Sequence, residues 1–120
     1  MSRFLVLVIV VIIALSGAVY WVYFVKPQTA DNKLDDFAKC LTSAGAVMYG
    51  AEWCAHCQDE KKLFGDSFKY VNYIECPDNI ERCLKAGVEG YPTWIFPDGK
   101  KLIGEQGLEK LSQESGCKLP

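Results

Sequence analysis

The sequence predicts an α/β fold in which helices flank a mixed four-stranded sheet, with one transmembrane helix in front of it. Three observations support this prediction. An uncharged run lies near the start, short strand-like and helix-like segments alternate after it, and 120 residues suffice for one compact domain. A large multidomain enzyme is thereby excluded. The part after the run carries all 15 acidic residues and all but one of the 13 basic residues, so it offers no basic patch for nucleic acid.

The uncharged run covers residues 4–25 and predicts a transmembrane helix, which would span about 33 Å. Aromatic side chains near its end suit the headgroup level of a bilayer, and they are Tyr20, Trp21 and Tyr23. The alternative is a cleaved signal peptide with a small-residue motif at Ser16-Gly17-Ala18. Cleavage there would leave a strongly apolar new N-terminus. We therefore expect an uncleaved signal anchor over residues 1–26.

Two features of the sequence predict opposite orientations for this helix in the membrane. Basic residues are more numerous after the run than before it, which by charge alone would leave the domain in the cytoplasm. These residues are Arg3 before the run, and Lys26, Lys33 and Lys39 after it. Domains longer than roughly 60 residues translocate largely regardless of such charges, and six cysteines suit an oxidising compartment. We expect a single-pass membrane protein with an extracytoplasmic domain, in contact with membrane lipid.

A short polar linker over residues 27–31 is expected to precede a domain over residues 32–120. Asp31 is a suitable N-cap for a first helix that ends near Ser43. The apolar stripe of this helix consists of Leu34, Phe37, Ala38 and Leu41. A strand over residues 46–50, a helix over residues 54–64 with Gly65 as its C-terminal cap, and a strand over residues 70–75 follow.

The second half of the domain begins with a helix that Pro77-Asp78-Asn79 opens and Gly87 ends. Ile80, Cys83 and Leu84 share one face of this helix. The remaining elements are a strand over residues 93–96, a turn over residues 97–100, a strand over residues 101–104 and a helix over residues 106–115. The first two strands, joined by a helix, should be parallel, and the last two antiparallel.

Cys54 and Cys57 form a C-x-x-C motif where the first strand gives way to a helix. Unpaired backbone N–H groups and the helix dipole favour a thiolate at Cys54, and the i, i+3 spacing lets Cys57 close a small disulfide. Cys54 is therefore expected to attack and Cys57 to resolve. His56 can add positive charge or a hydrogen bond to the Cys54 thiolate, which would make the disulfide more oxidising. A zinc site is the alternative, but the sequence has neither a second C-x-x-C motif nor another histidine.

Several motifs resemble the thioredoxin family over residues 46–115. They are Ala51-Glu52-Trp53-Cys54-Ala55-His56-Cys57, Gly90-Tyr91-Pro92-Thr93 and Asp98-Gly99-Lys100. Within this family the chain is most similar to the thioredoxin-like domain fused to bacterial vitamin K epoxide reductase homologues. The narrower resemblance is carried by Met48-Tyr49-Gly50-Ala51, by Gln58 with Lys61-Lys62-Leu63-Phe64-Gly65, by Glu75-Cys76 and by Gly90-Tyr91-Pro92-Thr93-Trp94.

The resemblance implies a thioredoxin-like fold for thiol–disulfide exchange. It also implies a cis Tyr91–Pro92 bond, which would explain why a proline opens a core strand. Pro92, with Tyr91 and Thr93, would form a backbone platform beside Cys54 that docks substrate peptides. Trp53 and Tyr91 flank the dithiol, and we expect them to line the substrate groove rather than the core. No cofactor and no metal is expected.

The chain departs from the family at two positions. Thioredoxins usually carry a buried acid on the first strand that relays the proton of the resolving thiol, and here Met48 takes that place. Glu52 could serve through water, although a solvated charge is the simpler interpretation. Ala55 replaces the proline of DsbA-type oxidants and the glycine of protein disulfide isomerases, whereas His56 matches both. The charged run over residues 58–62 is interpreted as a solvated helix face.

The other four cysteines suggest two structural disulfides. Cys76 ends a strand and Cys83 lies on the sheet-facing side of the next helix, so a bond between them is plausible; a second redox relay or free thiols are the alternatives. Cys40 and Cys117 would tie the two ends of the domain together if they pair. Sequence alone leaves the connectivity open.

The combined features favour a membrane-anchored thiol–disulfide oxidoreductase that exchanges disulfides with client proteins in the oxidative direction. By resemblance, a vitamin K epoxide reductase-like or DsbB-like quinone-linked membrane enzyme would reoxidise it. A tethered disulfide reductase or isomerase keeps the same fold but reverses the flow of electrons. A non-catalytic adaptor that uses the peptide groove to hold a membrane complex together is the third hypothesis.

Overall fold

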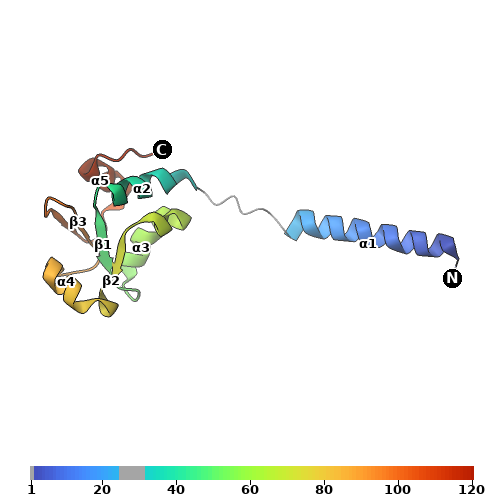
Figure 1. Cartoon of the computed structure of the whole chain (residues 1–120), viewed down its shortest axis with the longest axis horizontal. Helices are drawn as coiled ribbons and strands as arrows, with labels where there is room; N and C mark the ends of the chain where they lie inside the picture. The colour runs from blue at the N-terminus through green and yellow to red at the C-terminus, as the bar shows by residue number, and fades with distance from the viewer. Residues whose placement is uncertain (1, 25–31) are drawn as a thin grey trace.

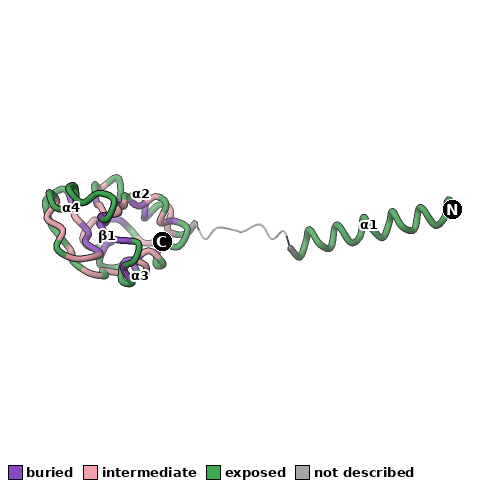
Figure 2. The backbone as a smooth tube through the Cα atoms, turned by 90° about the horizontal axis from the view of Figure 1, so that it is seen from below, coloured by how far each residue is buried: buried purple, intermediate pink, exposed green. Residues whose placement is uncertain are grey.

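The computed structural model describes residues 2–24 and 32–120 of the chain. Residue 1 and residues 25–31 lie outside this description, and with them the expected linker and the Asp31 cap. The first element is helix α1 (Arg3–Phe24), whose described side chains are all exposed (Figure 2). Its stretch Arg3–Tyr23 is long and apolar enough to cross a bilayer, with a mean hydropathy of 2.8; a signal sequence fits the same description.

The remaining elements alternate as the sequence predicts (Figure 1). They are α2 (Asp35–Ser43), β1 (Val47–Gly50), α3 (Ala55–Phe64), β2 (Tyr73–Glu75), α4 (Ile80–Ala86), β3 (Thr93–Ile95), β4 (Lys101–Ile103) and α5 (Gly107–Ser115). The four strands form one mixed sheet in the order β2-β1-β3-β4. β1 and β2 are parallel, and the β1–β3 and β3–β4 pairs are antiparallel, which confirms the predicted directions. This arrangement is a thioredoxin-like fold.

The sheet divides the interior into two apolar clusters, because successive side chains of a strand point to opposite faces. Met48 of β1 and Trp94 of β3 lie in the larger cluster, together with the buried side chains of α2, α3 and α5. Tyr49 lies in the smaller cluster, with Ile74 of β2 and Cys83 of α4. The larger cluster therefore holds three helices against one face, and a single short helix covers the other.

Two local expectations were wrong. β2 begins at Tyr73 rather than at residue 70, because Gly65–Tyr70 forms a 3₁₀ helix. Ser67 in this segment is buried and donates a hydrogen bond to Asp35 of α2, which holds the 3₁₀ turns against that helix. In α4 only Cys83 of the predicted apolar face is buried, whereas Ile80 and Leu84 are 62% and 70% exposed.

Candidate active site

Cys54 and Cys57 lie at the start of α3, directly after the loop that leaves β1. Cys54 is the N-cap residue, and its Sγ accepts a hydrogen bond from the Cys57 backbone N–H at 3.1 Å. This contact satisfies one of the N–H groups that a helix start leaves unpaired, which favours negative charge on the sulfur. Both residues are free thiols, 7% and 0% exposed respectively. The structure is therefore the dithiol form, with Cys54 the more accessible sulfur.

The Cys57 thiol is held in its protonated form by its surroundings. Burial is the largest cause, and together with the Cys54 side chain it raises the pKa of Cys57 to about 12. The charge of Lys61, one turn further along α3, acts in the opposite direction and lowers this pKa. Cys57 thus holds its proton at neutral pH, as a thiol that reacts after Cys54 should.

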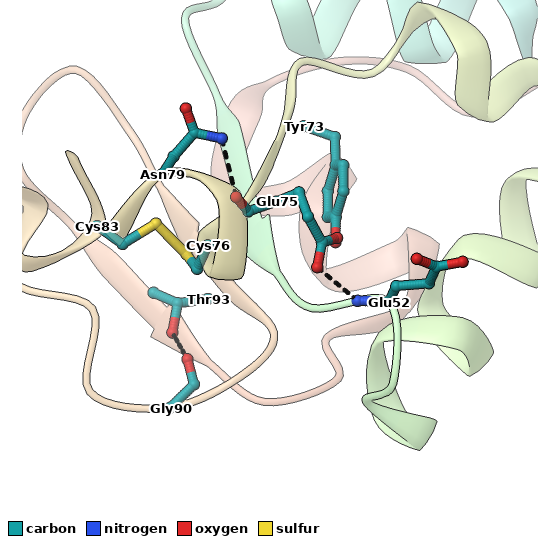
Figure 3. The surroundings of a disulfide bond; sticks show 8 residues. All are labelled: Glu52, Tyr73, Glu75, Cys76, Asn79, Cys83, Gly90 and Thr93. Atoms are coloured by element: carbon teal, nitrogen blue, oxygen red, sulfur yellow. Dashed lines mark hydrogen bonds between the residues drawn. A yellow bond between two sulfur atoms is a disulfide. The ribbon is translucent and has the colours of Figure 1, made fainter. Parts of the chain in front are cut away.

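The register of the sheet brings the Tyr91-Pro92-Thr93 segment beside the dithiol loop. Thr93 pairs with Tyr49, so Pro92 lies next to the end of β1, from which the loop to Cys54 leaves. The Tyr91–Pro92 bond is cis, and Pro92 and Thr93 are buried. The Thr93 hydroxyl donates a hydrogen bond to the Gly90 carbonyl at 2.7 Å (Figure 3). These contacts fix the segment close to the site.

Trp53, which is exposed, and Tyr91, which is half-buried, form an aromatic pair next to the dithiol. Their ring centroids are 5.9 Å apart in an edge-to-face arrangement. Trp53 is 74% exposed, so it is not a core residue. This position suits the groove-lining role that the sequence suggests for the two residues.

His56 makes no hydrogen bond to Cys54, which was one of the two contributions that the sequence suggests for it. Its exposed imidazole instead pairs with Glu105, at 2.5 Å between Nδ1 and Oε1. Glu105 belongs to the loop between β4 and α5. Helix geometry explains the difference, since the side chain at position 56 leaves the helix on another side than that of Cys57.

Sequence reasoning missed a buried acid, Glu60, within the run that it interpreted as solvated. Glu60 is 1% exposed and accepts three hydrogen bonds, which come from Trp94 Nε1–H at 3.2 Å and from the backbone N–H groups of Gln106 and Gly107 at 3.1 and 3.3 Å. Burial raises the pKa of Glu60 above its ordinary value. Glu60 lies three residues after Cys57 and four before Phe64, so the three share one helix face. This spacing could have predicted that Glu60 is buried.

A second polar group lies on the β2 side of Cys57. The Tyr73 hydroxyl donates to Glu75 Oε2 at 2.6 Å, and Glu75 Oε1 accepts the Glu52 backbone N–H at 2.8 Å. Figure 3 shows the Glu75 side chain extending toward Tyr73 and the Glu52 nitrogen, away from the Cys76–Cys83 disulfide. Glu52 itself is exposed, as expected for a solvated charge.

The other four cysteines are joined in two disulfides, Cys40–Cys117 and Cys76–Cys83. These are the two pairs suggested by the sequence. Within residues 2–24 and 32–120, no group of three or more His, Cys, Asp or Glu side chains could hold a metal ion. The dithiol is thus the only pair of free cysteines in the described part of the chain.

Comparisons with known proteins agree with this geometry. The chain is 45% identical over 91 residues to Thiol-disulfide oxidoreductase LTO1 of Arabidopsis thaliana, covering 68% of this chain and 24% of that protein. It is 33% identical over 124 residues to Protein disulfide isomerase-like 2-2 of Oryza sativa subsp. japonica, covering 83% of this chain and 32% of that protein. The chain thus spans about a quarter to a third of these curated relatives.

The chain was also compared with solved structures and with protein-family models. The thioredoxin of Fasciola hepatica has a TM-score of 0.46 and 21% identity, covering 61% of this chain and 79% of that one. No family model matches the chain. The sheet topology, the dithiol at the start of α3 and the sequence similarity to disulfide oxidoreductases show that the chain belongs to the thioredoxin-like family.

Proposed function

We propose that this chain is a membrane-anchored thiol–disulfide oxidoreductase whose Cys54–Cys57 pair exchanges disulfides with client proteins. The observation that carries the proposal is the pair of free cysteines at the start of α3, in a domain whose other four cysteines are already bonded. The names of the relatives, a thiol-disulfide oxidoreductase and a protein disulfide isomerase-like protein, support the same chemistry. Residues 1–26 would be the anchor, residues 27–31 the linker and residues 32–120 the exchange domain.

In the oxidative direction the cycle starts from the Cys54–Cys57 disulfide. A client thiolate attacks Cys54 Sγ, which breaks the Cys54–Cys57 bond and forms a mixed disulfide between client and Cys54. A second client thiolate then attacks the client sulfur of that bond and releases Cys54. The client has lost two electrons and gained a disulfide, and the domain is left as the dithiol. Pro92, with its neighbours Tyr91 and Thr93, would dock the client backbone while Trp53 lines the groove.

The two structural disulfides favour an oxidising compartment, because such bonds persist there, and the oxidative direction is the one we propose for a domain in that compartment. An extracytoplasmic domain on a membrane anchor would receive its oxidising equivalents from a membrane enzyme. The narrower sequence resemblance suggests a vitamin K epoxide reductase-like or DsbB-like quinone-linked partner. Membrane lipid would hold both proteins in one plane.

The mechanism is tested by oxidative refolding of a reduced client protein with the full chain in detergent. Cys54→Ser is expected to abolish disulfide transfer, because position 54 then has no sulfur to form the mixed disulfide and the Cys57 thiol is fully buried. Cys57→Ser, incubated with a client that already carries a disulfide, is expected to trap a mixed disulfide: the Cys54 thiolate attacks the client disulfide, one client sulfur leaves as a thiolate, and no thiol at position 57 resolves the bond. The trapped species is detected as a covalent adduct on a non-reducing gel. Full activity of Cys54→Ser would disprove the mechanism.

A tethered reductase or isomerase is the second candidate, and the similarity to a protein disulfide isomerase-like protein favours it. The reduction potential of the Cys54–Cys57 couple distinguishes the two. A value near that of DsbA, about −120 mV, supports an oxidant, and a value near that of thioredoxin, about −270 mV, supports a reductase. Equilibration of the full chain with glutathione buffers, followed by alkylation, gives this potential.

A further inference from the structure

The proton of Cys57 must move in every exchange cycle. Cys57 is a thiolate when it attacks or leaves a disulfide, and a thiol in the resting dithiol. Its side chain is fully buried, and its raised pKa keeps it protonated at neutral pH. Met48, on the neighbouring strand, is apolar and cannot take the proton. A group that accepts and returns the proton must therefore lie elsewhere within reach of the sulfur.

Gly50, the last residue of β1, leaves a path from Cys57 to Tyr73. A Cβ atom at Gly50 would lie 2.9 Å from Cys57 Sγ, 3.1 Å from Tyr73 Cε2 and 3.2 Å from the Tyr73 hydroxyl. The thiol and the hydroxyl thus border the same small space in front of Gly50. Any side chain at this position would stand between them, so glycine is needed for their approach.

The Tyr73 hydroxyl is already hydrogen bonded to a carboxylate on its other side. It donates to Glu75 Oε2 at 2.6 Å, and the Glu52 backbone N–H holds the second carboxylate oxygen (Figure 3). Tyr73 and Glu75 lie two residues apart on β2, so their side chains leave the same face of the strand. The three groups therefore follow one another in the order Cys57 thiol, Tyr73 hydroxyl and Glu75 carboxylate.

We propose that Tyr73 and Glu75 form the proton path of Cys57, with Glu75 as the acceptor and the Tyr73 hydroxyl as the relay. This inference rests on the proposed exchange function. When Cys57 attacks a mixed disulfide at Cys54, its proton passes to the Tyr73 oxygen, directly or through one water molecule, and the Tyr73 hydrogen passes to Glu75. A Cys54–Cys57 bond forms, the bond from Cys54 to the client breaks, and the client leaves as a thiolate. In the oxidative direction Glu75 returns the proton to the departing Cys57.

The other ionisable groups around Cys57 do not provide this path. Cys54 is its reaction partner, and Glu60 is committed to the three hydrogen bonds described above. Lys61 lies over the Tyr73 ring, with Nζ 3.8 Å from the centroid, and as a cation it stabilises the Cys57 thiolate rather than accepting its proton. Burial, followed by the bond to Glu75, raises the pKa of Tyr73, so the hydroxyl keeps a hydrogen to pass on.

The two thiols can be followed separately in one reaction of the reduced full chain in detergent with equimolar 5,5′-dithiobis(2-nitrobenzoate). Attack by Cys54 releases one thionitrobenzoate, and intramolecular attack by Cys57 releases the second. Tyr73→Phe keeps the ring but removes the relay, and Glu75→Gln keeps an acceptor for the Glu52 N–H but cannot take a proton. We expect the second phase to slow about tenfold at pH 7 in both variants, with an unchanged first phase. Each variant should reach the second-phase rate of the parent only at a pH that is about one unit higher.

Two matched variants serve as controls. Tyr49→Phe removes a tyrosine hydroxyl from the opposite face of the sheet, and Glu109→Gln neutralises an exposed carboxylate on α5. Both control variants should match the parent in both phases.

Three outcomes would contradict the proposal. If the second phase of Tyr73→Phe and of Glu75→Gln is as fast as that of the parent, the proton path is overturned and the exchange function stands. A slower second phase without the pH shift would also overturn it, as a packing defect. Failure of the parent to release the second thionitrobenzoate would overturn the exchange function itself, and the proton path with it.

Discussion

At the scale of single residues, Cys54 and Cys57 lie one helical turn apart and have different surroundings. Cys54 caps α3 with its sulfur at the helix start, where the Cys57 N–H contacts it. Cys57 points into the core, where burial raises its pKa. A nucleophile must meet a client, whereas a resolving thiol must wait until the mixed disulfide exists. The environments of the two sulfurs agree with that order of reaction.

Glu60 joins the core to the loop that carries Glu105. Its carboxylate accepts from Trp94 in β3 and from Gln106 and Gly107 after β4, so one side chain ties three segments together. Glu60→Ala would leave the buried Trp94 donor and two half-buried backbone donors without this acceptor, and it would open a cavity. We expect it to lower the free energy of unfolding by about 2–4 kcal/mol in urea titrations followed by circular dichroism. A loss below about 0.5 kcal/mol would contradict this assignment.

The same residue predicts a pH dependence of stability. Because the folded-state pKa of Glu60 is raised, the folded protein binds this proton more tightly than the unfolded chain. Its contribution is fully present below the ordinary carboxyl pKa and is lost as the pH rises through the folded-state value. The stability of the parent relative to Glu60→Gln should therefore fall as the pH increases from about 4.5. Parallel stability curves for the two proteins over this range would show that Glu60 is not responsible.

At the scale of elements, the two disulfides act on different parts of the fold. Cys40–Cys117 ties α2 to the segment after α5 across 77 positions of sequence. Cys76–Cys83 spans only 7 positions and fastens α4 to the end of β2. α4 has few other anchors, since Ile80 and Leu84 are exposed, so this short bridge keeps the helix on its face of the sheet.

The difference in loop length predicts a difference in stabilisation. Closing the longer loop removes more conformational freedom from the unfolded chain, and chain entropy gives about 4.5 kcal/mol for Cys40–Cys117 against about 2.5 kcal/mol for Cys76–Cys83. The double variant Cys40→Ala with Cys117→Ala should therefore lower the urea midpoint further than Cys76→Ala with Cys83→Ala. Alanine avoids adding a buried hydroxyl. The reverse order would mean that local packing around α4 outweighs chain entropy.

At the scale of the whole molecule, the described residues include one apolar helix and a domain with six cysteines, of which four are bonded. The two properties are compatible if the domain lies outside the cytoplasm, where disulfides persist. The proposed cycle needs that location, because its clients and its quinone-linked partner would be found there.

The redox state of the cysteines in intact cells tests this arrangement. Acid quenching followed by mass-tag alkylation should show Cys40, Cys76, Cys83 and Cys117 protected. Cys54 and Cys57 should be largely oxidised if the domain donates disulfides, and single Cys→Ser variants assign each bridge. Six reduced cysteines would place the domain in the cytoplasm and contradict the proposed orientation.

Much of this molecule could be predicted from local sequence patterns. The order of elements and the strand directions follow from the alternation of apolar segments and from the connections between them. The place of Cys54 at a helix start follows from the C-x-x-C motif after a strand. Strand β2 was predicted too long, because Ser67 is held by Asp35, a contact across 32 positions that no local pattern shows.

The sequence by itself determined the fold class, the dithiol and the apolar helix, since each depends on residues close together in the chain. Only the tertiary structure decided which polar side chains meet at the site. Glu60 is buried because Trp94 and the loop after β4 close over it, and His56 pairs with Glu105 from that loop. The β1–β2 register pairs Tyr73 with Met48, and the Tyr73 ring extends to the space in front of Gly50 that Cys57 Sγ also borders. Strand register and loop packing fix these contacts, and both are properties of the folded chain.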